Sequence, residues 1–229
     1  MPDSAADSLS PARRFTTPGE AYEALMEGNA RYVAGTPSHP NQDVSRRSAL
    51  ANTQEPFVSL FGCSDSRVAA EMIFDVGLGD MFVVRTAGQV SDSASIGTLE
   101  YGVEVLGTPL LVVLGHDSCG AVTAAVDSYT TGETPGGFIE DLVTRILPSV
   151  VHARGEGFTD VQGAVVQNTI DTVMRLPRRS TLIRRALRRG SLEIVGLTYH
   201  LADGRVNLVS RLGAAVNDNG NPVDLVRDR

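Results

Sequence analysis

A continuous apolar run, LLVVLG, occupies residues 110–115, and the polar segment HDSCG follows it directly at residues 116–120. A run of this kind is typical of a strand that is buried on both faces of a parallel sheet. Two further runs have the same character, FVSLFG at residues 57–62 and MFVVR at residues 81–85. Segments with helical spacing separate these runs, so the sequence predicts an α/β fold in which helices cover a central sheet.

The predicted sheet is mostly parallel, with four strands plus an antiparallel edge strand. Residues 192–199 supply the fourth strand, and the turn at Asp203-Gly204 leads to the edge strand at residues 205–210. Helices are expected at residues 68–74, 93–106 and 121–129, with three or four more between residues 137 and 189.

The amino-terminal part divides into a tail and the start of the fold. Residues 1–14 are small and polar, lack the apolar segment of a secretory signal, and are expected to be disordered. Thr17 and Glu20 match a capping box, which predicts a helix that begins at Pro18. Neither an internal repeat nor a low-complexity linker interrupts the remainder, so residues 15–229 are expected to form one domain.

The composition narrows the possible classes of function. The 229 residues are 42% hydrophobic, enough for a substantial core, and carry a formal net charge of −7. This charge argues against a general nucleic-acid partner, and no apolar run approaches the ~20 residues that span a bilayer. Two cysteines without a secretory signal indicate a reducing cytoplasm, where cysteines are more often ligands or catalysts than disulfides. Arginines gather between residues 178 and 189, which indicates a solvated helix face or a subunit contact, with a local anion site as the alternative.

Both cysteines lie close to predicted strand ends, where parallel α/β sheets bind their ligands. Cys63 follows the strand at residues 57–62, and Cys119 lies three positions after His116, which follows another strand. Two thiolates and one imidazole form a soft set that suits Zn²⁺, and three protein ligands leave a fourth position for water. Two alternatives stay open at this point: the cysteines could be small buried hydrophobes, or one could pair with His116 as a nucleophile.

Asp65 and Arg67 follow Cys63 and lie two positions apart, so in an extended segment they share one face. An ordinary surface ion pair is one interpretation of this spacing. Beside a zinc ligand, the pair has a sharper role, because Asp65 as a fourth ligand would close the site. If Arg67 holds Asp65 away, water can take that position, and Asp65 can accept a hydrogen bond from the O–H of the resulting hydroxide and so orient it.

Five segments together resemble the β-class carbonic anhydrases. They are CSDSR at residues 63–67, HDSCG at 116–120, EGNARY at 27–32, GDMFVVR at 79–85 and LEYG at 99–102. The resemblance covers most of the chain and implies a zinc enzyme with an α/β sheet that interconverts carbon dioxide and bicarbonate. It also implies an obligate homodimer that often pairs into tetramers.

The resemblance also implies a role for each residue of the centre. Cys63, His116 and Cys119 become the ligands of one Zn²⁺ per subunit. Asp65 and Arg67 become the catalytic dyad that gates the fourth zinc position, with Asp65 as a possible fourth ligand in an inactive form. The implied reaction is attack of zinc-bound hydroxide on carbon dioxide.

The substrate is expected to contact four further residues that the resemblance implies, Gln54, Phe82, Tyr101 and Gly120. Gln54 is similar to a hydrogen-bond donor to the substrate. Phe82 and Tyr101 match residues that line a small apolar pocket across the dimer interface. For Gln54, Phe82 and Tyr101, an ordinary loop amide and ordinary core residues are the alternative interpretation.

The chain departs from the family pattern in two places. The segment TAGQ at residues 86–89 replaces the frequent N-x-A-N after the second strand, which is expected to reshape a turn near the pocket. Some members bind bicarbonate at a second site through a tryptophan, whereas this chain has Leu60 at that position and contains no tryptophan. Arg85 and Tyr199 match the other members of that second site.

Two rival functions stay open from the sequence. The same scaffold could act on another small linear molecule, such as carbon disulfide or carbonyl sulfide, because a sequence does not show access to the pocket. A structural or sensory zinc protein without turnover is the other rival, and four fixed protein ligands would favour it.

Overall fold

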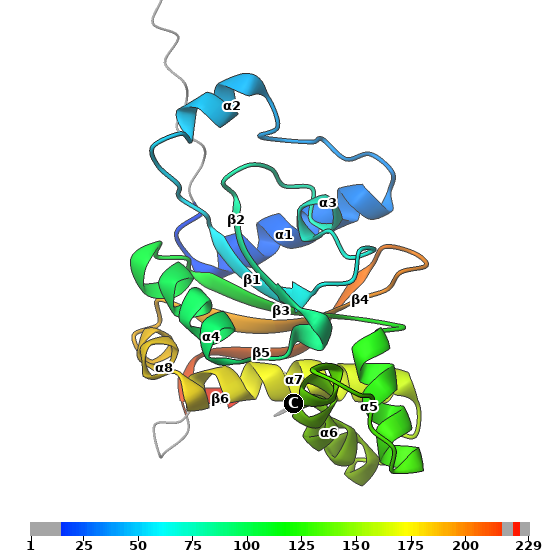
Figure 1. The fold of residues 1–229 in the computed structure, drawn as a ribbon. Coiled ribbons are helices and arrows are strands. Elements are labelled where there is room, and N and C mark those ends of the chain that lie inside the picture. The colour runs from blue at the N-terminus through cyan, green and yellow to red at the C-terminus, as the bar shows by residue number, and fades with distance from the viewer. Residues whose placement is uncertain (1–14, 217–221, 225–229) are drawn as a thin grey trace, which may run out of the picture.

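The computed structural model describes residues 15–216 and 222–224, and the tail expected at residues 1–14 lies outside them. A six-stranded sheet in the order β2-β1-β3-β4-β5-β6 forms the centre, and helices lie on both of its faces (Figure 1). The elements are α1 (Pro18–Val33), α2 (Val44–Ala49), β1 (Val58–Cys63), α3 (Ala70–Ile73), β2 (Met81–Thr86), the 3-10 turn η1 (Ala87–Gln89), α4 (Ser93–Glu100), the π-helical turn η2 (Tyr101–Val105), β3 (Leu110–His116), α5 (Gly120–Thr131), α6 (Ile139–Gly155), α7 (Val161–Arg179), α8 (Thr181–Arg188), β4 (Glu193–Tyr199), β5 (Val206–Val216) and β6 (Pro222–Asp224).

The sheet confirms the predicted topology, which is mostly parallel. β1 pairs in parallel with β2 and β3, and β3 pairs in parallel with β4, whereas the pairs β4–β5 and β5–β6 are antiparallel. The turn predicted at Asp203-Gly204 joins β4 to β5. However, β5 continues to Val216 and pairs with β6, so the edge of the sheet is one short strand further out than expected. In the register, Cys63 of β1 lies beside Thr86 of β2.

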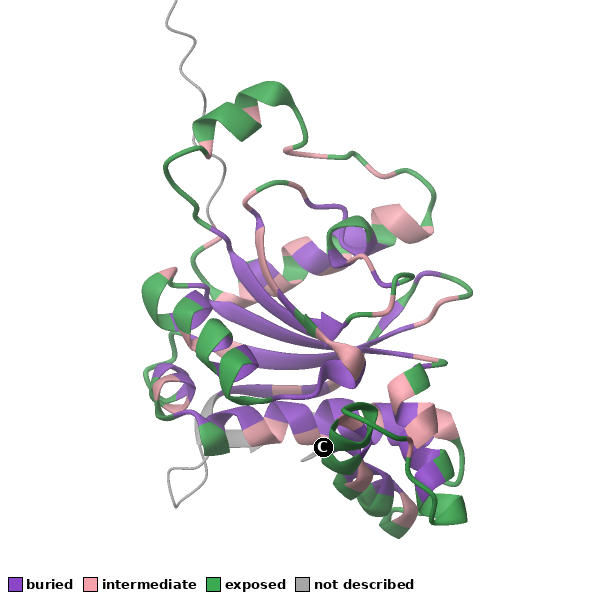
Figure 2. Ribbon diagram, viewed as in Figure 1, coloured by how far each residue is buried: buried purple, intermediate pink, exposed green. Residues whose placement is uncertain are grey.

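Alternate residues of the central strands pack into different cores, as expected for a sheet covered on both faces. On β1, Leu60 packs with residues of α1 and α3, whereas the next residue, Phe61, packs with residues of α4, α7 and α8. Figure 2 shows that the central strands are buried along most of their length, while the outer faces of the helices are exposed. A third core contains residues of α5, α6 and α7 together with Cys63 and Cys119.

α1 begins at the predicted capping box. Thr17 Oγ1 accepts a hydrogen bond from the Glu20 N–H, and the Glu20 carboxylate accepts one from the Thr17 N–H. The helix passes so close to the end of α3 that a Cβ atom on Gly28 would lie 1.8 Å from the carbonyl oxygen of Phe74. Only glycine fits at this crossing.

Asn29, the next residue of α1, is buried and ties the helix to two distant segments. Its side-chain amide donates to the carbonyls of Ile73 and Gly204, at 3.1 and 2.8 Å, and its oxygen accepts from the Val206 N–H at 3.2 Å. Because all three partners are main-chain groups, this part of the EGNARY segment serves the packing of α1.

α2 stands apart from the sheet, and none of its residues is buried (Figures 1 and 2). Asp43 caps the helix by accepting from the Arg46 N–H. Arg46 in turn donates to the carbonyl of Leu78 at 3.0 Å and lies 3.4 Å from a carboxylate oxygen of Asp80. These contacts connect α2 to the loop that precedes β2.

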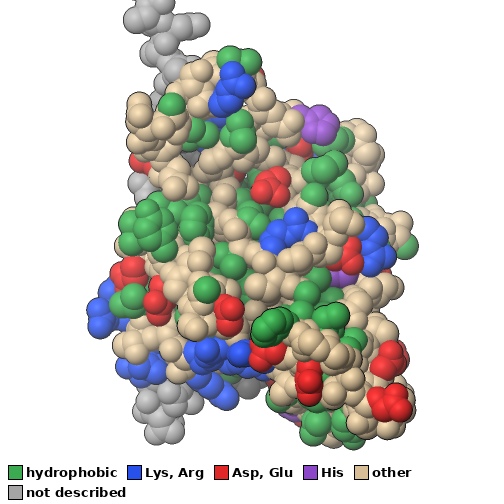
Figure 3. All heavy atoms as spheres, viewed as in Figure 1, with side chains coloured by type: hydrophobic (Ala, Val, Ile, Leu, Met, Phe, Trp, Pro, Cys, Tyr) green, Lys and Arg blue, Asp and Glu red, His purple; other side chains and the backbone are tan. Residues whose placement is uncertain are grey.

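The arginines between residues 178 and 189 lie at the end of α7 and on α8, whose apolar residues face the core. Figure 3 shows basic side chains gathered over this part of the surface. Arg179 donates to the carbonyl of Ser91 at 2.8 Å, and Arg189 lies 3.5 Å from Glu104, so these two arginines contact neighbouring elements of the same chain. Within the described residues, no helix combines the length and apolar character that crossing a membrane requires.

Asp75 is a buried carboxylate that joins the loop after α1 to the end of α3. It accepts hydrogen bonds from the N–H groups of Ser38 and His39 at 2.9 Å, from the Ser38 hydroxyl at 2.9 Å and from Arg31 at 2.6 Å. Burial would raise the pKa of Asp75, but the combined donors outweigh burial and hold this pKa well below its usual range.

The low pKa of Asp75 predicts a stability term that depends on pH. Because the folded-state pKa lies below the unfolded value of about 3.9, the ionised carboxylate stabilises the fold above that pH and loses its effect as the pH falls further. We expect Asp75→Asn to lower the free energy of unfolding by about 1–3 kcal/mol near neutral pH, because the groups that donate to Asp75 lose a charged acceptor. Urea denaturation at fixed protein concentration measures this difference.

The difference between the wild type and Asp75→Asn should shrink as the pH is lowered from about 5 to about 2. Asp127→Asn, at an exposed position of α5, is the matched control and should change the free energy of unfolding by less than about 0.5 kcal/mol. A difference for Asp75→Asn that stays constant across the acid range would contradict the assignment.

Candidate metal centre

Three side chains with soft donor atoms meet at the carboxyl edge of the sheet. Cys63 is the last residue of β1, and His116 is the last residue of the neighbouring parallel strand β3. Cys119 follows after a tight turn and is the N-cap residue of α5. Near the end of β3, a Cβ atom on Gly115 would lie 2.2 Å from Thr169 Oγ1 of α7, so glycine lets the strand approach that helix closely. The predicted ligands therefore converge because two parallel strands end side by side.

The three donor atoms are buried and lie within 4.8 Å of one another, and the two sulfur atoms are 3.9 Å apart. A tetrahedral Zn²⁺ with Zn–S bonds of about 2.3 Å would hold two sulfurs about 3.8 Å apart. His116 Nδ1 lies 2.7 Å from the carbonyl oxygen of Asp117, which assigns the proton to Nδ1 and leaves the lone pair of Nε2 to the cluster. Nε2 is fully buried and has no hydrogen-bond partner among the described residues. The cluster thus has the chemistry and spacing to hold a metal ion.

The side chains of the cluster compete for protons. The hydrogen bond between the sulfurs lowers the pKa of Cys63 and raises the pKa of Cys119, which burial raises further. Burial lowers the pKa of His116, but the Cys63 sulfur, the Asp117 main chain and the Asp65 carboxylate together outweigh burial, so the net shift is upward. The Cys63 thiolate is buried, and its negative charge favours protonation of the neighbouring cysteine and histidine. A cation bound at this position would stabilise the same negative charge.

Asp65 and Arg67 form the ion pair that their spacing predicts. The Arg67 N–H and Nε both donate to Asp65 Oδ1 at 2.9 Å, and Nη2 donates to Oδ2 at 2.7 Å. The side-chain hydrogen bond from Arg67 is the main reason that the pKa of Asp65 lies well below its usual range. Asp65 Oδ2 is also 3.9 Å from His116 Nε2, so Arg67 holds a carboxylate directly beside the donor atoms.

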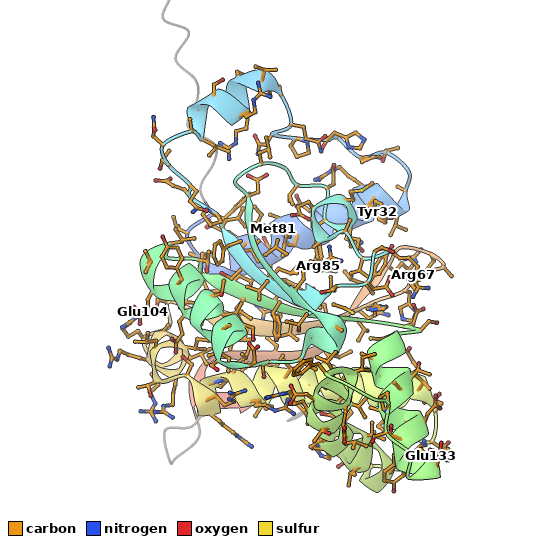
Figure 4. All side chains as sticks on the ribbon, viewed as in Figure 1. Tyr32, Arg67, Met81, Arg85, Glu104 and Glu133 are labelled. Atoms are coloured by element: carbon orange, nitrogen blue, oxygen red, sulfur yellow. The ribbon has the colours of Figure 1, made fainter. Side chains whose placement is uncertain are left out.

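Arg85 binds the main-chain carbonyls on both sides of Ser64, the residue after Cys63. The sequence did not predict this role. Its Nε donates to the carbonyl of Cys63 at 2.9 Å, and its Nη2 donates to the carbonyl of Asp65 at 2.6 Å. Figure 4 shows Arg85 and Arg67 towards the same end of the sheet, while Met81 lies at the start of β2. In the sequence, Arg85 is a charged residue at the end of an apolar run and a match to a second bicarbonate site, and neither feature indicates these contacts.

The positions that the sequence resemblance matched to a second bicarbonate site are engaged within the chain in this structure. Two donor groups of Arg85 are engaged by carbonyls, and Leu60 is buried in the core next to α1. Tyr199 is 3% exposed, and its hydroxyl lies 3.4 Å from the hydroxyl of Tyr32.

The turn η1 lies beside the cluster, and the sequence predicted its role only in part. The sequence predicts that the unusual segment at residues 86–89 reshapes a turn near the pocket. The structure shows a direct contact from this turn, because the Gly88 N–H lies 3.3 Å from Cys63 Sγ. A hydrogen bond from a main-chain N–H to a sulfur leaves no residue-type signal by which sequence reasoning could find it.

The predicted substrate residues divide into two groups by their place on the sheet. Gly120 begins α5 directly after Cys119 and therefore lies at the cluster. Gln54 precedes β1, whose six residues separate its ends by roughly 17 Å, and lines a surface hollow together with Tyr101. Phe82 pairs with Ser59, about 13 Å along the strands from Cys63, and its ring centre lies 5.9 Å from that of Tyr101. Within one chain, Gln54, Phe82 and Tyr101 therefore do not lie at the cluster of the two cysteines and His116.

Comparison with known proteins agrees with this geometry. Residues 58–206 match the carbonic anhydrase family. The chain is 54% identical over 198 residues to a carbonic anhydrase of Mycolicibacterium smegmatis, with 86% of this chain and 96% of the relative covered. It is 53% identical over 198 residues, with the same 86% and 96% coverage, to carbonic anhydrase 2 of Mycobacterium tuberculosis.

Solved structures give the same result. A tetrameric β-carbonic anhydrase of the ascomycete Sordaria macrospora matches with a TM-score of 0.65 at 26% identity, with 82% of this chain and 95% of that chain covered. The chain therefore belongs to the β-carbonic anhydrase family and is an enzyme of the class whose general reaction is the hydration of carbon dioxide. The resemblance inferred from the sequence motifs is confirmed.

Proposed function

We propose that this chain catalyses the reversible hydration of carbon dioxide to bicarbonate and a proton, at a Zn²⁺ held by Cys63, His116 and Cys119. The observation that carries the proposal is the buried set of two sulfurs and one imidazole nitrogen beside an ion-paired carboxylate. Three protein ligands of this kind are typical of catalytic zinc sites, because a closed structural site has four. Zinc held there would act as a Lewis acid and supply hydroxide near neutral pH.

Asp65 has the position to orient the attacking oxygen. Arg67 holds the carboxylate through side-chain contacts at 2.9 and 2.7 Å, beside His116. Held in this way, Asp65 accepts a hydrogen bond from the O–H of the nucleophile. This contact directs a lone pair of the nucleophile's oxygen towards carbon dioxide. Release of Asp65 from Arg67 would let the carboxylate take the fourth metal position, so the ion pair acts as a gate.

Gln54, Phe82 and Tyr101 act, in this proposal, at the cluster of a partner copy of the chain. β2 is an edge strand of the sheet, and Tyr101 and Val105 next to it are 45% and 63% exposed. Figure 3 shows hydrophobic side chains on the surface beside β2 and α4. A homodimer that buries this surface would supply an apolar pocket and an amide donor for carbon dioxide, whereas Gly120 comes from the chain that holds the metal.

The surroundings of the enzyme follow from the same chemistry. The cysteines of the cluster are both free, and a reducing cytoplasm would keep them available to the metal. The tetramer described for the Sordaria macrospora relative supports a homo-oligomer, either a dimer or a dimer of dimers. Carbon dioxide and bicarbonate are the small-molecule partners, and the released proton passes to buffer.

The carboxylate role predicts the behaviour of Asp65→Asn. We expect stopped-flow measurements between about pH 6 and about pH 9 to show at least a tenfold lower kcat, because positioned acid–base groups typically contribute about 10²–10⁴-fold. The zinc content should not change, since Asp65 is not one of the three ligands. Asp127→Asn is the matched control on an exposed helix face and should keep wild-type activity. Asp65→Asn with full zinc and activity within about twofold of the wild type would show that Asp65 has no such role.

A shared site predicts recovery of activity when two defective chains are mixed. Gln54→Ala and Cys119→Ser should each be strongly impaired, but a heterodimer contains one site with an intact cluster and an intact glutamine. Random pairing should therefore restore about a quarter of the wild-type sites. The control pair, His116→Ala with Cys119→Ser, should give no recovery, because both changes affect residues of one cluster. If the Gln54→Ala and Cys119→Ser mixture is no more active than its components, the substrate residues do not act across chains.

A further inference from the structure

Gly88 lies between two hydrogen bonds that join the metal cluster to α7. Its N–H is 3.3 Å from Cys63 Sγ, and its carbonyl accepts a hydrogen bond from Asn168 Nδ2 at 3.1 Å. Both contacts are buried, and Asn168 is 2% exposed although it lies 80 residues along the chain from Gly88. The contacts form a continuous path from a helix of the core to the sulfur of a ligand.

The turn at Gly88 has to be held in place by its surroundings. Gly88 is left-handed, with φ of 61° and ψ of 26°. A Cβ atom at this position would lie 2.8 Å from Ile146 Cδ1 and 3.0 Å from Ala121 Cβ, so a side chain would require these neighbours to shift and would strain the left-handed backbone. Glycine populates several backbone conformations with similar ease, so the residue does not orient its own N–H. The hydrogen bond from Asn168 to the Gly88 carbonyl restrains the peptide unit that follows Gly88 and so limits the movement of the residue.

Asn168 differs from two buried threonines near it in α7 in where its donor group goes. Thr169 and Thr172 also lie in this part of α7, and their hydroxyls return to helix carbonyls, those of Val165 and Asn168. The Asn168 side chain instead leaves the helix and reaches Gly88. A buried amide is costly unless it is hydrogen-bonded, so this contact fixes both partners.

We propose that Asn168 is a positioning residue for the Cys63 thiolate, because it holds the Gly88 N–H against the sulfur. The N–H dipole withdraws charge from the thiolate and thereby sets how strongly Cys63 donates to the metal. This inference rests on the zinc site of the proposed function. Removal of a group that hydrogen-bonds to a metal ligand, without itself binding the metal, typically lowers metal affinity about 10- to 100-fold.

The test compares metal binding by Asn168→Ala and by the wild-type chain. Competition with a chromogenic chelator should show zinc affinity lower by about tenfold or more in Asn168→Ala. In protein loaded with Co²⁺, the absorption from sulfur-to-metal charge transfer should move to longer wavelength, because a thiolate without its N–H donor is more electron-rich. A merely structural role for Asn168 would leave the energy of this absorption unchanged.

Thr172→Val is the matched control on the same face of α7. It removes a buried hydroxyl that donates only to the helix carbonyl of Asn168 at 2.7 Å, and it keeps the side-chain shape. We expect it to change stability but neither the zinc affinity nor the cobalt spectrum. Wild-type values for Asn168→Ala, or an equal spectral shift in Thr172→Val, would overturn the proposal.

A measurement on the unmodified sequence covers the case in which Asn168→Ala does not fold. In wild-type protein labelled with [¹⁵N]glycine and loaded with ¹¹³Cd, the Gly88 amide should show scalar coupling to the metal through the N–H···S contact. Coupling of the metal to the Cys63 Cβ protons without any at Gly88 would overturn the inference and leave the zinc site standing. A wild-type chain that binds no metal at all would instead remove the proposed function.

Discussion

The parallel pairing of β1 with β3 is the constraint on which the site depends. It ends two strands side by side, so that Cys63 and His116 meet although they are far apart in sequence. The turn after β3 then adds Cys119, whose sulfur lies 3.9 Å from that of Cys63. Buried thiolate charge is costly without a compensating cation, so the geometry that the sheet imposes is also what makes metal binding favourable.

The groups around the cluster hold its main chain more than they add chemistry. Arg85 fixes the carbonyls of Cys63 and Asp65, while Gly88 directs its N–H at the sulfur. Such contacts keep donor atoms within the small tolerances that a metal site needs. The opposite end of the same strands carries the apolar and amide groups suited to a small uncharged substrate. In the proposed function, each chain would contribute its metal cluster to one active site and these groups to the site of a partner copy.

Local patterns carried most of what could be predicted from the sequence. Apolar runs marked β1, β2, β3 and β4, the capping box marked the start of α1, and the strand-end cysteines marked the cluster. The short strand β6 and the contacts of Arg85 could not be predicted from the sequence, because both depend on partners distant in sequence and on main-chain groups that every residue has. The same reason hides Asn168, whose partner is a carbonyl 80 residues away. When a side chain hydrogen-bonds to a main-chain group, the partner can be any residue type, so the sequence contains no second residue that indicates the contact.

Zinc dependence of carbon dioxide hydration tests the central claim most directly. Metal-free protein, prepared under reducing conditions and titrated with Zn²⁺, should gain hydration activity in proportion to bound zinc. The activity should stop rising at one ion per chain, as expected for a single set of three ligands. Cys119→Ser, prepared in the same way, should gain almost none. Full hydration activity in the metal-free chain, or undiminished zinc-dependent activity in Cys119→Ser, would contradict the account.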